Sequence, residues 1–263
     1  MISRLASAKL ITPTILSLIG LAILLGLGTW QWNRKAWKEH ILATVKARSA
    51  SAPLYANASW PGLSCHDAKD TGLASPCEYQ PVSLRGTFDH TRERHIFTAA
   101  PSAPGLASDR GFWIFTPLVL DGSGKTVFVN RGFVPENEKE QASRVAGQTS
   151  QSAEIKGLYR SAQERGMFDG QNDPAKNIWY VRAPAELWPA DPAAPAQDEL
   201  WAYIDQTGPV PAGGYPLPLA GKVELSNRHL EYAITWYALA LTLLGVYGTY
   251  AWGRLKAVQA GSA

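Results

Sequence analysis

A histidine beside an apolar segment is the residue of this sequence best suited to hold a ligand. His229 stands three residues before a stretch without charged residues, from Tyr232 to Gly253. If a helix begins near His229, the residues three, four, seven and eleven positions further on share its face. They are Tyr232, Ala233, Trp236 and Ala240. Small and aromatic side chains below an imidazole form a slot that can admit a flat apolar ring.

Such a slot suits haem. A neutral imidazole nitrogen ligates haem iron, while the porphyrin packs against apolar and aromatic side chains. The propionates need cations, and three are expected at the same depth: Arg34, Lys38 and Arg228. The alternative is that His229 and the aromatic residues form a belt that anchors helices at a membrane surface. The same two interpretations, slot wall or belt, apply to Trp30, Trp32 and Trp37.

Familiar catalytic motifs are missing from the sequence. It contains no G-x-S-x-G nucleophile elbow, no H-E-x-x-H zinc helix and no C-x-x-C redox pair. The segment 122–126 resembles a phosphate-binding loop, but Val119 stands where that motif needs its first glycine, so a turn is predicted. His66, His90 and His95 lack companions and are expected to be structural or solvated. The sequence predicts a protein that is not an enzyme.

Two cysteines flank a short loop. Cys65 and Cys77 can form a disulfide in an oxidising compartment. The alternative is a metal site with His66 as a third ligand, although the close spacing of zinc-binding cysteine pairs is missing.

Two uncharged stretches can position the candidate residues. Residues 10–33 and 232–253 each reach the roughly 20 residues that a helix needs to cross a bilayer. The first stretch has no Ala-x-Ala cleavage pattern after it, so an anchor rather than a signal peptide is expected. The tails 1–9 and 254–263 carry only basic charges, which predicts cytoplasmic termini and an outer domain of residues 34–231. Arg34, Lys35 and Lys38 oppose that orientation, but long domains cross largely regardless of charge.

The segment between the two stretches is predicted to be rich in β-structure. It holds all 22 acidic residues and is near neutral in net charge, which argues against nucleic acid as a partner. After a helical continuation over 34–48 and a connector over 49–62, β-branched and aromatic residues alternate with polar ones. The expected strands are 79–88, 94–98, 111–120, 125–134, 153–160, 177–182, 200–205 and 222–226. The predicted fold is a mostly antiparallel barrel or sandwich with a few short helices, flanked by two transmembrane helices. In these helices, Ala22-x-x-x-Gly26 and Gly245-x-x-x-Thr249 offer small faces for close approach.

Several segments together resemble the Surfeit locus protein 1 family, the assembly factors of haem-copper cytochrome oxidase. The matching segments are Leu27–Arg34 with Trp37–Lys38, Val82–Phe88, Thr116–Leu118, Val129–Pro135 and Asn227–Ala240. The resemblance implies cytoplasmic termini, a domain in the periplasm or intermembrane space, and no catalysis. It also implies that His229 holds haem a for delivery to oxidase subunit I. The sequence departs from the family pattern at Arg228, where a second Asn is usual, and at Phe133, where Trp is common.

The residues and the resemblance lead to one leading hypothesis. The protein is expected to be an assembly factor that binds haem a between its helices, with His229 on the iron and Tyr232, Trp236, Arg34 and Trp30 around it. The expected partners are oxidase subunit I, haem a synthase and membrane lipid. The short amino terminus lacks an Arg- and Ser-rich transit segment, which favours the bacterial inner membrane over mitochondria.

Two alternative functions remain open from the sequence. The first is a scaffold that stabilises oxidase subunit I without carrying haem. The second is a two-span regulator of envelope polysaccharide length, which would need long extracytoplasmic helices.

Overall fold

The computed structural model describes residues 9–58, 60, 73, 75–100, 109–188, 200–218 and 227–260. The chain forms two compact units. One is helical and comprises Met1–Ala43 with Glu224–Ala263, and the other comprises Thr44–Val223.

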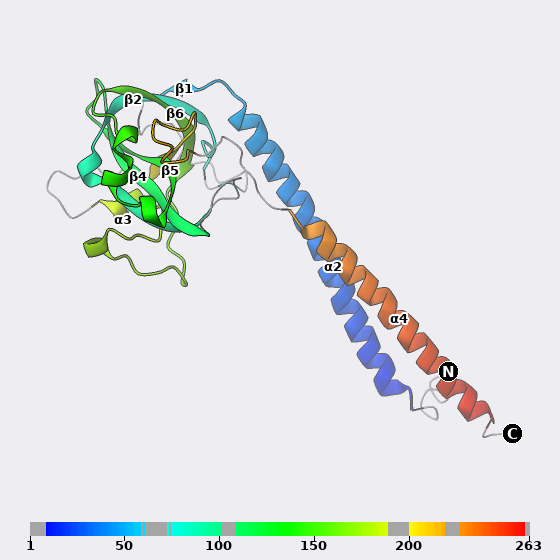
Figure 1. Cartoon of the computed structure of the whole chain (residues 1–263). Coiled ribbons are helices and arrows are strands. Elements are labelled where there is room, and N and C mark those ends of the chain that lie inside the picture. Colours follow the sequence, from blue (N-terminus) through cyan, green and yellow to red (C-terminus); the bar gives the residue numbers. More distant parts are fainter. Residues whose placement is uncertain are drawn as a thin grey trace. The chain divides into compact units, whose positions relative to one another are not determined.

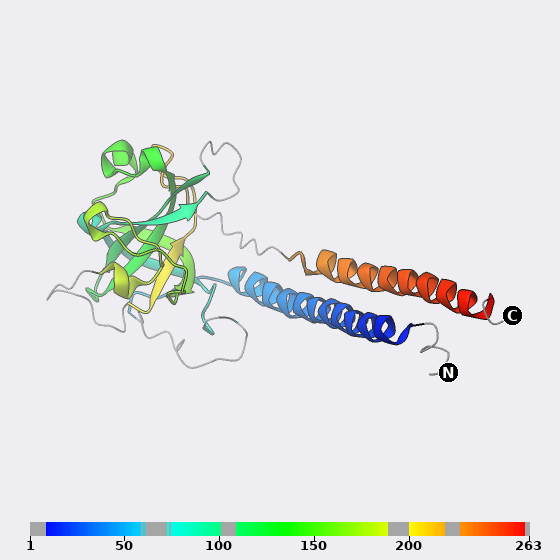
Figure 2. The same cartoon turned by 90° about the horizontal axis from the view of Figure 1, so that it is seen from below.

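The helical unit is built from two long helices, α2 (Ile11–Ser49) and α4 (His229–Ala260). Both are long and apolar enough to cross a membrane, and their most apolar windows are only 6% and 11% buried. The core helix of a soluble protein would hide such a surface, so the exposed apolar side chains indicate membrane association. As expected, α2 continues as helix beyond its uncharged part. Figures 1 and 2 show α4 beside the first part of α2.

Polar and close-packed contacts join the two helices. The hydroxyl groups of Thr14 and Tyr247 are hydrogen-bonded, and Thr29 Oγ1 lies 3.2 Å from the Tyr237 hydroxyl. The ring of Tyr237 packs so closely on Gly28 that a Cβ atom there would lie 2.8 Å from it. A large ring therefore fills a notch left by one glycine.

The prediction of packing through two small-residue faces is wrong in its residues. A Cβ atom at Gly26 or at Gly245 would meet nothing within 4 Å. The face of α2 that contacts α4 passes through Gly20 and Gly28, and Gly26 lies on a different side of the helix.

The second unit is a seven-stranded sheet that closes on itself. Its strands are β1 (Leu54–Tyr55), β2 (Pro81–Phe88), β3 (Arg94–Ala99), β4 (Arg110–Leu120), β5 (Thr126–Pro135), β6 (Ala153–Ser161) and β7 (Ala202–Gln206). They follow the order β1-β2-β6-β7-β5-β4-β3, and an added β2–β4 pairing closes a barrel of β2, β6, β7, β5 and β4. Only β1–β2 and β5–β7 are parallel. The mostly antiparallel barrel is confirmed. The described part of this unit holds strands and short helices in place of the long helices that a regulator of envelope polysaccharide length would need.

Short helices lie in the segments between the strands of the barrel. They are the 3-10 turns η1 (His90–Arg92), η2 (Glu136–Glu138), η3 (Gln141–Gly147) and η4 (Pro174–Lys176), and the α-helix α3 (Pro184–Leu187). The loop 122–126 is a turn between antiparallel β4 and β5, as predicted.

The barrel interior follows from alternation along the strands. Val82 and Leu84 of β2, with Val127 and Val129 of β5, point into one core and lie within one buried cluster. The opposite face of β5 packs into a second cluster around Trp179 and Trp188. Because β5 packs on both faces, every residue of the strand after Thr126 is buried, including the polar Asn130 and Arg131.

One predicted strand is wrong and another cannot be placed. Residues 177–182 contain only isolated bridges at Ile178 and Trp179, since Asn177 takes a left-handed conformation with φ of 50° after the turn at Pro174. The predicted strand 222–226 lies outside the described residues. The connector 49–62 contains the two-residue strand β1, which was not predicted from the sequence.

Candidate functional site

His229 is the first residue of α4, and a side chain of α2 holds its imidazole. Its Nδ1 atom lies 2.7 Å from Oε1 of Gln31. Because an amide oxygen only accepts hydrogen bonds, His229 donates through Nδ1, and the neutral form of this imidazole then carries its lone pair on Nε2. Histidines that ligate a metal through one ring nitrogen commonly donate the other N–H to an oxygen in this way. The Gln31 contact therefore selects the tautomer that iron ligation through Nε2 requires.

The face of α4 beside His229 is partly covered. The side chains of Ala233 and Ala240 are buried, and Trp236 is half-buried. In contrast, Tyr232 is 52% exposed, and Trp30, next to Gln31 on α2, is 56% exposed. The two alanines pack within the helical unit, whereas Tyr232 and Trp30 leave aromatic surface open near His229.

The cations expected near the histidine differ in the side chains that they contact. The guanidinium carbon of Arg34 lies 3.7 Å from the ring centre of Trp37. Stacking uses the face of the guanidinium. Its N–H groups lie in the plane of the group and can still donate to an anionic ligand. Arg228 instead pairs with Glu231 at 2.9 Å. Arg34, one turn beyond Gln31 on α2, is thus the better placed cation for a carboxylate ligand.

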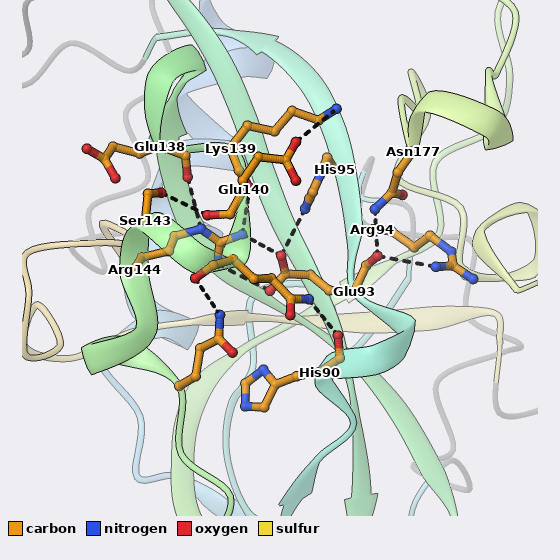
Figure 3. A network of polar contacts seen from close by, with 12 residues as sticks. His90, Glu93, Arg94, His95, Glu138, Lys139, Glu140, Ser143, Arg144 and Asn177 are labelled. Atoms are coloured by element: carbon orange, nitrogen blue, oxygen red, sulfur yellow. Dashed lines mark hydrogen bonds and ion pairs between the residues drawn. The ribbon is translucent and has the colours of Figure 1, made fainter.

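A second group of ionisable side chains lies in the β unit, between β3 and the segment of η2 and η3. Figure 3 shows His95 and Arg144 reaching the Glu93 carboxylate. His95 Nε2 lies 2.9 Å from Glu93 Oε1, and both terminal nitrogens of Arg144 donate to the carboxylate. Arg144 also donates to the backbone carbonyls of Glu138 and Lys139. All three ionisable side chains are buried, so this cluster fastens η3 onto the barrel.

The charge of Glu93 depends on its partners. Burial raises the pKa of its carboxyl, but hydrogen bonds from His95 and Arg144 and the charge of Arg144 outweigh burial and hold the pKa at about 2. Glu93 is therefore ionised at neutral pH and balances Arg144. His95, which the sequence predicted to be structural or solvated, is buried in this structural cluster.

An open cleft of about 460 Å³ borders the cluster. Its lining residues are Thr91, Glu93, Arg94, Gln141, Pro174, Asn177 and Trp179. Asn177 Nδ2 donates to the Glu93 carbonyl at 2.9 Å, and Trp179 Nε1 donates to Asn177 Oδ1 at 2.8 Å. These polar groups of the wall bond to one another, which gives them a structural role.

The metal site considered for the cysteine loop is excluded at Cys77. This cysteine is disulfide-bonded and therefore offers no thiolate to a metal. Cys65 and His66 lie outside the described residues. Within the described part of the chain, no three His, Cys, Asp or Glu side chains come together where they could hold a metal ion.

The structure thus places every predicted site residue in the helical unit. His229, Tyr232 and Trp236 come from α4, and Trp30 and Arg34 come from α2. Gln31 was not among the site residues predicted from the sequence. Its signal was an amide inside an uncharged stretch, where a polar side chain needs a partner.

The fold and this site define a class of protein: a membrane-associated chain with a β-barrel unit between two apolar helices and a histidine at the start of the second. A model of the SURF1 family matches residues 18–241. The chain belongs to the SURF1 family.

Curated relatives agree with the family match. Surfeit locus protein 1 of Xenopus tropicalis is 32% identical over 241 residues, covering 86% of this chain and 70% of that protein. Surfeit locus protein 1 of Mus musculus is 32% identical over 226 residues, 81% of this chain and 67% of its own length. The SURF1-like protein of Monosiga brevicollis is 32% identical over 232 residues, 84% of this chain and 81% of its own. The resemblance seen in separate motifs therefore extends over most of the chain.

Proposed function

We propose that the protein is an assembly factor for cytochrome c oxidase that holds haem a at His229 and delivers it to oxidase subunit I. Membership of the SURF1 family supports a role in oxidase assembly. The observation that carries the haem assignment is the hydrogen bond from His229 Nδ1 to Gln31 Oε1, because it presents Nε2 as an iron ligand.

The residues around His229 fit the other parts of a haem. The exposed rings of Tyr232 and Trp30 supply apolar surface for a porphyrin, and Arg34 supplies a cation for a propionate. Nε2 of His229 would hold the haem iron through its lone pair. No residue of this set is a nucleophile or a general base in a closed site, which fits a carrier better than a catalyst.

The spectrum of the purified protein tests this proposal. Full-length protein from cells that make haem a is expected to retain the pigment, and His229→Ala is expected to lose most of it. His40→Ala, an exposed histidine of α2, is the matched control and should keep the wild-type haem content. Equal haem content in His229→Ala and in the wild type would overturn the assignment.

The same variants separate haem delivery from a scaffold role. If the carrier proposal holds, cells with His229→Ala make oxidase that is depleted in haem a, as cells without the gene do. Full haem a in the oxidase of His229→Ala cells, together with its loss in cells without the gene, would favour a scaffold that does not carry haem.

A further inference from the structure

The loop between β6 and η4 presents two adjacent apolar side chains to solvent. Met167 is 91% exposed and Phe168 is 97% exposed. They occupy the corner of a turn in which the Asp169 N–H donates to the Gly166 carbonyl at 3.3 Å. Such corners ordinarily carry Gly, Pro, Asn, Asp or Ser. Because neither side chain is packed in the folded unit, their apolar character points to something outside it.

Hydrogen bonds hold the turn in one shape. Arg165 donates to the Gly170 carbonyl at 2.7 Å, and its guanidinium pairs with the Glu186 carboxylate. The Gly166 N–H donates to the Asp169 carboxylate at 2.7 Å. The loop therefore keeps its polar groups bonded to one another while its two apolar side chains point outward.

Packing adds to this order. A Cβ atom at Gly170 would lie 2.8 Å from the ring of Tyr180, so the base of the turn lies flat on that ring. Asn172 bridges the same region, donating to Glu186 at 2.8 Å and accepting from the Tyr180 N–H at 3.2 Å. A preformed loop loses little conformational freedom when its tip becomes buried elsewhere.

The loop leaves the barrel near the place where the chain enters it. The last turn of α2 belongs to the β unit, and Arg48 in that turn donates to the Glu78 carbonyl at 3.1 Å. The Glu78 carboxylate accepts from the Ser161 N–H at 2.8 Å, at the end of β6. The base of the loop is thus two contacts away from the last turn of α2, and the charge-bearing segment 34–48 of this helix separates that turn from its uncharged part.

We propose that the Met167–Phe168 turn inserts into the surface of the membrane that holds α2 and α4. A specific protein interface needs about 800 Å² on each partner, whereas this apolar patch ends after two side chains, at Arg165 and Asp169. A lipid surface needs no complementary shape, and the two apolar helices of this chain keep it close by. The neighbouring charges form no basic cluster, so insertion depends on apolar burial rather than on anionic headgroups.

Insertion would turn one side of the β unit toward the lipid. The β unit is already joined to an apolar helix at each of its two ends. The inserted turn adds a third attachment to the membrane and limits rotation of the unit about those two links. This proposal does not depend on haem binding at His229, and its experiment needs no haem.

A fluorescent label at the tip tests the proposal. The full-length variant Phe168→Cys carries an environment-sensitive nitrobenzoxadiazole label in nanodiscs of zwitterionic lipid. Cys77 does not compete for the label because it is disulfide-bonded. The matched control is Val145→Cys, at an exposed apolar residue of η3. We expect a blue-shifted emission at position 168 and quenching of roughly half of it or more by spin-labelled lipid, whose label lies at the depth that interfacial side chains reach. Emission at position 145 should stay as in water.

Three outcomes would overturn the proposal. The first is a label at position 168 that stays in water with lipid alone and is buried only when oxidase subunits are added, which would assign the turn to a protein partner. The second is a label that stays in water in both conditions. The third is equal quenching at positions 168 and 145, which would indicate unspecific adsorption. Loss of the quenching after Met167→Ser in the labelled variant would support the proposal further.

Discussion

At the scale of residues, a single hydrogen bond distinguishes His229 from His90 and His95. His95 is buried in an ion cluster, and His90 places Nε2 at 3.0 Å from the Thr149 carbonyl. His229 alone of these three bonds through Nδ1 and lies at the start of an apolar helix. Gln31 thereby acts as a positioning residue for the proposed ligand.

Changing Gln31 should weaken haem binding without abolishing it. Gln31→Leu removes the oxygen that selects the His229 tautomer, and loss of such a partner costs about 10- to 100-fold in metal affinity. Gln31→Glu keeps an acceptor at that place and should bind haem nearly as well as the wild type. Titration of the haem-free protein, followed by absorbance, compares the two. Equal affinity in Gln31→Leu and Gln31→Glu would contradict the role of Gln31.

The Glu93 cluster should make the stability of the β unit depend on pH. The pKa of Glu93 falls from 4.5 to about 2 on folding, so its contribution is complete above about pH 4.5 and disappears as the pH falls through about 2. The free energy of unfolding, measured with urea on the full-length protein, should therefore fall more steeply over this pH range in the wild type than in Glu93→Gln. Glu136→Gln, at an exposed carboxylate, is the control and should follow the wild type. A wild-type slope in Glu93→Gln would refute the assignment.

At the scale of elements, the two helices pair through particular side chains rather than through general small-residue faces. Gly28 and Gly26 lie two positions apart on α2, yet only Gly28 faces the partner helix, where it receives the ring of Tyr237. This pair of glycines offers a matched test of the helix interface.

Enlarging Gly28 should separate the helices near His229. Gly28→Leu places side-chain atoms where the Tyr237 ring lies, and overpacking of this kind costs about 1 to 3 kcal/mol. Gly26→Leu points away and should have little effect. The readout is thiol crosslinking between Gln31→Cys and His229→Cys with a short bifunctional reagent, which should fall in Gly28→Leu only. Equal crosslinking in both glycine variants would show that the Tyr237 contact does not hold the helices together.

At the scale of the whole molecule, the apolar helices enclose the β unit in the sequence. If both helices cross one membrane, the two chain ends share one side and the β unit occupies the other. The disulfide at Cys77 fits an oxidising compartment for that unit.

Reporter fusions should show this topology in bacterial cells. Green fluorescent protein after residue 263 should fluoresce, because it folds in the cytoplasm. Alkaline phosphatase inserted in the β4–β5 turn at 122–124 should be active, because it needs an oxidising compartment. The turn is exposed and tolerates insertion better than a strand would. The opposite pair of results would reverse the orientation.

By itself, the sequence determined the features that depend on neighbouring residues. Uncharged length predicted both apolar helices, and period-two alternation predicted β2 to β7, because burial of a strand face is visible in adjacent residues. The same reasoning failed at 177–182, where aromatic residues are buried by tertiary packing without forming a strand. The sequence also singled out His229, since its place before an apolar stretch is a local property.

Only the tertiary structure decided which distant residues meet. Closure of the barrel rests on β2–β4 pairing, and the partners Gln31 and His229 lie 198 positions apart. Arg144 reaches Glu93 across 51 positions, and Phe168 is exposed although its side chain is apolar. These features depend on contacts between remote segments or on the lack of them, and periodicity within one segment carries no information about either.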